Sequence, residues 1–104
     1  MSVGREARLV VGNDGEEPLD LILEPWGDVH RIVPGETCVV VTHTSSESGA
    51  WPGTRLGDEP FEVCHGPTWL TVWVNGDCFH LYDRKGDEIE PYVYGGCPDQ
   101  QPSA

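Results

Sequence analysis

The sequence has few basic residues and no long apolar run. Six Lys and Arg face eighteen Asp and Glu among 104 residues, which gives a formal net charge of −12. Such a field repels phosphate backbones and anionic lipid at any distance that salt does not screen. Direct binding to nucleic acid or to a membrane is therefore disfavoured. No apolar segment has the length of a signal peptide or a spanning helix, so we expect a cytoplasmic protein.

Recognisable catalytic motifs are also absent. The chain contains no nucleophile elbow, no HExxH and no phosphate-binding glycine loop, so we expect neither an enzyme nor a cofactor. The four cysteines, Cys38, Cys64, Cys78 and Cys97, include no CxxC pair. Without a secretion signal, we expect them to be reduced, although loss of a leader would reverse that expectation. A blue-copper site is disfavoured, because Met1 is the only methionine and no cysteine is closely followed by a His and a weak axial ligand.

Short strand patterns dominate what is present. They recur about every ten residues between Gly, Pro, Asn and Asp clusters, and no segment keeps a helical apolar period. The prediction is an all-β protein, a small two-sheet β-sandwich or flattened barrel of seven to eight mostly antiparallel strands. We expect residues 1–94 to form a single domain and residues 95–104 to form a flexible tail. Strands are expected near Arg8–Val11, Leu19–Glu24, Val29–Val33, Cys38–His43, Phe61–Cys64, Thr68–Asn75, Cys78–Tyr82 and Glu88–Tyr94. Residues 44–60 are expected to form a long surface loop or a crossover between sheets.

The segment from Leu19 to Val33 predicts a hairpin with a four-residue connection. Antiparallel pairing would place Leu19, Leu21, Leu23, His30 and Ile32 on one core face. Arg31 would lie on the other face, between Asp20 and Glu24. Pro34-Gly35 fits the centre of a type II turn, and Trp26 is expected to fold over one end of the core.

The run LDLILEPWGDVHRIVPGETCVVV, residues 19–41, resembles a motif of small uncharacterised bacterial all-β proteins. In these proteins one strand ends in EPW-G and the next ends in P-G. The resemblance implies a bacterial source and a compact β domain, and it transfers no functional residue.

The segment TWLTVWVNGDCFHLYD, residues 68–83, predicts a second hairpin, because Asn-Gly is a strong signal for a type I′ turn. Its register would place an aromatic, uncharged set on one face, namely Trp69, Thr71, Trp73, Cys78, His80 and Tyr82. The loop residues Trp51 and Leu56 are candidates to cover this face. The alternative is a partner, since aromatic side chains with polar tips are enriched at interfaces.

Three functions remain open from the sequence. The first is a non-enzymatic interaction module that binds a protein partner, possibly basic, or a second copy of itself through Trp69, Thr71, Trp73, His80 and Tyr82. The second is a small zinc-type metal-binding protein that uses Cys64, Cys78 and His80. The third is an acidic inhibitor that mimics DNA through the run from Asp14 to Asp28, which contains no Lys or Arg. His43 is interpreted only as a polar residue at a strand end.

Overall fold

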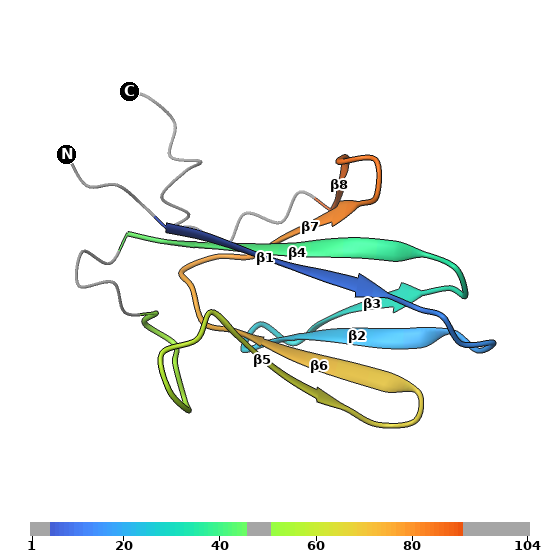
Figure 1. Ribbon diagram of the computed structural model, residues 1–104, viewed down its shortest axis with the longest axis horizontal. Helices are drawn as coiled ribbons and strands as arrows, with labels where there is room; N and C mark the ends of the chain where they lie inside the picture. Colours follow the sequence, from blue (N-terminus) through green and yellow to red (C-terminus); the bar gives the residue numbers. More distant parts are fainter. Residues whose placement is uncertain (1–4, 46–50, 91–104) are drawn as a thin grey trace.

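Two four-stranded β-sheets make up the part of the chain that the computed structural model describes, residues 5–45 and 51–90 (Figure 1). The strands are β1 (Arg5–Gly12), β2 (Leu19–Glu24), β3 (Asp28–Ile32), β4 (Thr37–Thr44), β5 (Phe61–His65), β6 (Trp69–Val74), β7 (His80–Asp83) and β8 (Glu88–Glu90). These residues form no helix, and thus no helix that is long and apolar enough to cross a membrane. The all-β prediction is confirmed, while the predicted tail lies outside the described residues.

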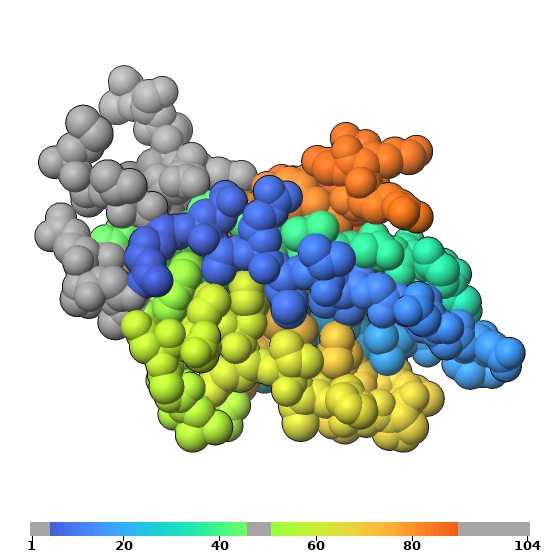
Figure 2. All heavy atoms as spheres, viewed as in Figure 1, coloured from blue at the N-terminus to red at the C-terminus, as the bar shows by residue number. Residues whose placement is uncertain are grey.

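The first sheet has the strand order β1-β4-β7-β8 and is antiparallel throughout. The second sheet has the order β3-β2-β6-β5, in which β2 and β6 pair in parallel. The sheets lie one above the other in Figure 1, and their side chains fill the space between them in Figure 2. The two sheets form an open sandwich, and no barrel closes among the described strands.

Apolar side chains from both sheets form the core. Alternate residues of a strand point to opposite faces, so one face of each strand carries these side chains. Each is at most 6% exposed: Val11, Leu21, Leu23, Ile32, Cys38, Val40, Val72, Val74, Phe79 and Leu81. Burial of a Val or Leu side chain stabilises a fold by about 1.5–3 kcal/mol. Contact between these residues therefore holds the two sheets together.

The hairpin from Leu19 to Ile32 has the predicted core face, but Val29 lies opposite Ile22 and not opposite Glu24, so the register expected from a connection of residues 25–28 is wrong by two residues. Leu21 lies opposite His30, and Leu19 lies opposite Ile32. Arg31 Nε lies 3.2 Å from Asp20 Oδ1 on the exposed face. The turn that follows is also confirmed, because Gly35 has a φ of 85° and Glu36 N donates to Val33 O over 3.0 Å.

Trp26 covers one end of the core, as predicted. Its ring centroid lies 4.8 Å from that of Phe79, and the indole packs against the core cluster. β4 ends at Thr44 in the first sheet and β5 begins at Phe61 in the second, so the crossover predicted for residues 44–60 is also confirmed. Within the segment that connects β4 to β5, Trp51 is buried, whereas Leu56 is 80% exposed.

The predicted hairpin from Thr68 to Asp83 is wrong. β6 pairs with β2 and β5, whereas β7 pairs with β4 and β8. The segment at Asn75-Gly76 therefore crosses between the sheets, and neither residue has the positive φ of a type I′ turn. Asn75 is buried, and its side-chain amide donates to Glu59 O over 2.7 Å, so tertiary contacts override the local turn preference.

Candidate metal centre

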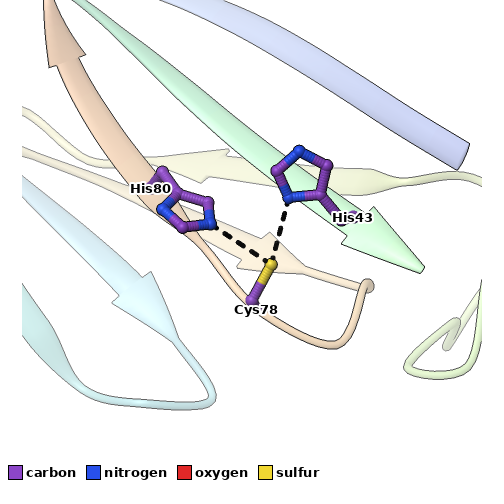
Figure 3. Close-up of side chains that lie close together, drawn as sticks. All are labelled: His43, Cys78 and His80. Atoms are coloured by element: carbon purple, nitrogen blue, oxygen red, sulfur yellow. Dashed lines mark hydrogen bonds between the residues drawn. The ribbon is translucent and has the colours of Figure 1, made fainter. Parts of the chain in front are cut away.

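Three potential metal ligands converge on one face of the first sheet. His43 is on β4, His80 is on β7, and Cys78 lies two residues before β7 (Figure 3). Because β4 and β7 pair with Val41 opposite His80, both imidazoles project from the face that points away from the second sheet. One ligand atom from each residue lies within 4.8 Å of the others.

The segment that carries Cys78 is held against β4 by backbone contacts. Asp77 N donates to His43 O over 2.7 Å, and the hydroxyl of Thr42 donates to Cys78 O over 2.6 Å. Gly76 makes this approach possible. A Cβ at that position would collide with the hydroxyl of Thr42 and would lie 2.6 Å from His43 O. The close passage of the crossover over β4 thus positions Cys78 between the two histidines.

The sulfur of Cys78 lies between the two imidazole rings. His43 Nδ1 is 3.3 Å from Cys78 Sγ, and His80 Nε2 is 3.5 Å from the same sulfur. A zinc ion bound tetrahedrally by one thiolate and one imidazole would hold the sulfur and the nitrogen about 3.5 Å apart. Both sulfur–nitrogen separations therefore fit ligands of a common ion.

A carboxylate binds the outer nitrogen of each ring. His43 Nε2 lies 3.1 Å from Glu6 Oε1, and His80 Nδ1 lies 3.1 Å from Glu88 Oε2. Since an ionised carboxylate only accepts hydrogen bonds, both outer nitrogens carry protons that they donate. In the neutral rings, the inner nitrogens then present lone pairs toward the sulfur.

All three candidate ligands are buried. His43 is 6% exposed, Cys78 is 2% exposed and His80 is 1% exposed. The order Glu6, His43, Cys78 also matches the carboxylate, base and nucleophile of a catalytic triad. However, a thiol at this depth is not presented to a substrate in solution. The arrangement is thus better suited to holding an ion than to nucleophilic attack.

The sequence identified two of these three residues. Cys78 and His80 were predicted to share a face as metal ligands, and the structure brings them together. The third candidate, Cys64, is exposed on β5 in the other sheet, away from this cluster. His43 was missed because its neighbours in space come from β7, and only the strand order reveals that pairing.

The predicted partner-binding residues are divided between the two sheets. Trp69, Thr71 and Trp73 lie on β6, whereas His80 and Tyr82 lie on β7. The register places the first group on the outer face of the second sheet and the other group on the outer face of the first. These five residues therefore do not form one continuous surface.

Comparison of the chain with protein-family models, curated proteins and solved structures finds no match. The resemblance of residues 19–41 to small bacterial proteins stays a prediction.

Proposed function

We propose that the protein binds a single thiophilic transition-metal ion, zinc or copper, through His43, Cys78 and His80. Thiolate and imidazole are the donors that zinc and copper share, whereas magnesium and calcium prefer oxygen. In this proposal the ion has a structural or carrier role, because each of its three ligands is at most 6% exposed.

The observation that supports this function most strongly is the pair of carboxylates behind the histidines. Metal-bound histidines commonly donate their second N–H to a carboxylate, which fixes the tautomer and makes the ligating nitrogen more basic. Here both rings have that arrangement, one through Glu6 and the other through Glu88. Both inner nitrogens then face the same sulfur.

Metal titration of the full chain tests the proposal. Chelator-stripped protein would be dialysed against zinc, copper(I) or magnesium, and the bound metal per chain would be measured by inductively coupled plasma mass spectrometry. We expect one zinc or copper ion and no magnesium. The wild type would be compared with Cys78→Ser and with Cys64→Ser, which removes an exposed thiol from the other sheet.

The two serine variants distinguish this site from the ligand set predicted from the sequence, which was Cys64, Cys78 and His80. We expect Cys78→Ser to lose the ion and Cys64→Ser to keep it. Equal loss in both variants would assign the ion to a different ligand set. A wild-type chain that retains no metal would refute the proposed function.

A further inference from the structure

The outer face of the second sheet carries two tryptophans on one strand. Trp69 and Trp73 alternate along β6 with the partly buried Leu70 and the buried Val72 and Val74, and Thr71 lies between the two tryptophans. Four residues of extended strand place the two tryptophans about 13 Å apart. Trp69 is 37% exposed, and its ring packs over Gly66, where a Cβ would collide with it. We call Trp69, Thr71 and Trp73 the tryptophan face.

Carboxylates flank both tryptophans. Asp20 pairs with Trp69 and Glu24 pairs with Trp73 across the parallel β2–β6 ladder. On the other side, Glu62 of β5 pairs with Trp73. Residues that pair directly across a ladder share a face and have Cβ atoms about 5 Å apart. Each indole therefore has an acidic neighbour on the same surface.

Two arginines of the chain already contact an indole or a carboxylate of this surface. The guanidinium of Arg55 lies 4.5 Å from the ring centroid of Trp73, and Arg31 Nε lies 3.2 Å from Asp20 Oδ1. Guanidinium combines stacking on an aromatic ring with hydrogen bonding to a carboxylate. The chain's own side chains thus show which cation fits the tryptophan face.

A shallow cavity of about 290 Å³ opens beside Trp73. It is lined by Arg55, Leu56, Glu62, Val63, Cys64, Thr71 and Trp73. Arg55 and Leu56 belong to the crossover between the sheets and are exposed, so neither is held by core packing. A side chain that stacked on Trp73 would take the place of Arg55.

We propose that the tryptophan face binds an extended, arginine-containing segment of a basic protein. One guanidinium would stack on Trp69 near Asp20, and another would displace Arg55 from Trp73 near Glu24 and Glu62. The net charge of −12 attracts such a segment and opposes docking of nucleic acid, anionic lipid or a second copy of this chain. This proposal does not depend on the metal centre, which lies on the other sheet.

Fluorescence anisotropy with a labelled peptide tests the proposal. The probe is Arg-Ser-Gly-Ser-Arg, whose arginines have the spacing of the two tryptophans. It would be compared with peptides that carry lysine or glutamine in place of both arginines. We expect the arginine peptide to bind about tenfold more tightly than the lysine peptide and the glutamine peptide not to bind. Equal binding of all three peptides, or no binding of the arginine peptide, would overturn the proposal.

Two variants locate the binding surface. Trp69→Ala is expected to weaken binding about tenfold, which is the range of a desolvated cation–π contact. Arg55→Ala is expected to tighten binding, because it removes the internal competitor for Trp73. If Arg55→Ala instead weakened binding, Arg55 would be part of the site and the displacement would be refuted.

Thr71→Arg keeps the test decisive if Trp69→Ala fails to fold. Thr71 lies on the sheet surface between the tryptophans, so the new charge would repel the peptide without entering the core. Val10→Ala is the matched control, since Val10 is 66% exposed on β1 of the other sheet. Loss of binding in Val10→Ala, or normal binding in Thr71→Arg, would move the site away from the tryptophan face.

Discussion

Glu6 lies directly opposite His43 in the β1–β4 ladder, with its Oε1 3.1 Å from the outer nitrogen of the imidazole. Glu88 of β8 makes the same kind of contact with His80, with its Oε2 3.1 Å from Nδ1, although the ladder places Glu88 opposite Tyr82. Both outermost strands of the first sheet thus contribute a carboxylate behind a candidate metal ligand.

These carboxylates are predicted to control metal affinity. We expect Glu6→Gln and Glu88→Gln each to weaken metal binding about 10-fold to 100-fold, because each makes one ligating nitrogen less basic and less firmly oriented. The measurement is competition for zinc against a chromophoric chelator. Glu16→Gln is the control, because Glu16 is exposed in the connection between β1 and β2. Unchanged affinity in both test variants would leave the carboxylates without a role at the metal.

Gly76 is predicted to be required for both stability and the metal centre. In Gly76→Ala, the added methyl group would push the crossover away from Thr42 and His43 of β4, and Cys78 would move with it. We expect a loss of about 1–3 kcal/mol in the free energy of unfolding, together with weaker metal binding. Urea unfolding measures the first effect.

Gly12→Ala is the control for Gly76→Ala. A Cβ at Gly12 makes only an ordinary contact of 3.4 Å with the Thr37 hydroxyl, so we expect a much smaller change in stability. Equal stability of the two variants would mean that the crossover does not need glycine at position 76.

Cys38 is predicted to make stability depend on pH in the alkaline range. Burial, with a smaller contribution from the charge of Glu36, raises the pKa of the Cys38 thiol from 9.0 to about 11. Between these two values, the unfolded chain releases the proton and the folded chain retains it. The contribution of the protonated Cys38 thiol to the free energy of unfolding is therefore complete below about pH 9 and is lost as the pH rises through about 11.

Urea unfolding between about pH 8 and pH 11 measures this effect. The fall in stability that belongs to Cys38 is expected to be absent in Cys38→Ala, although that variant is less stable at every pH. Alkylation gives a second readout. At about pH 8, iodoacetamide should modify the exposed Cys64 and spare Cys38. Rapid alkylation of Cys38 in the folded chain would contradict its burial.

Local patterns predicted the parts of the fold that depend on neighbours in sequence. The alternation from Leu19 to Ile32 defined a hairpin and its buried face, because both strands and the connection lie within one short segment. Pro34-Gly35 similarly predicted its own turn, since the backbone preferences of these two residues are local.

The strand order could not be predicted in the same way. Asn75-Gly76 favours a hairpin locally, yet β6 gains a parallel partner in β2 and β7 gains a partner in β4. These pairings join segments that are far apart in the chain, and short-range patterns do not encode them. The same pairing explains why Cys78 and His80 were found as candidate ligands while His43 was not.

X-ray absorption spectroscopy of the zinc-loaded full chain tests the central claim most directly, because it reports the atoms bound to the ion. The account predicts one sulfur at about 2.3 Å and two imidazole nitrogens at about 2.0 Å. The sulfur signal should disappear in Cys78→Ser and persist in Cys64→Ser. A zinc shell without sulfur, or a chain that retains no zinc to measure, would contradict a metal centre built from His43, Cys78 and His80.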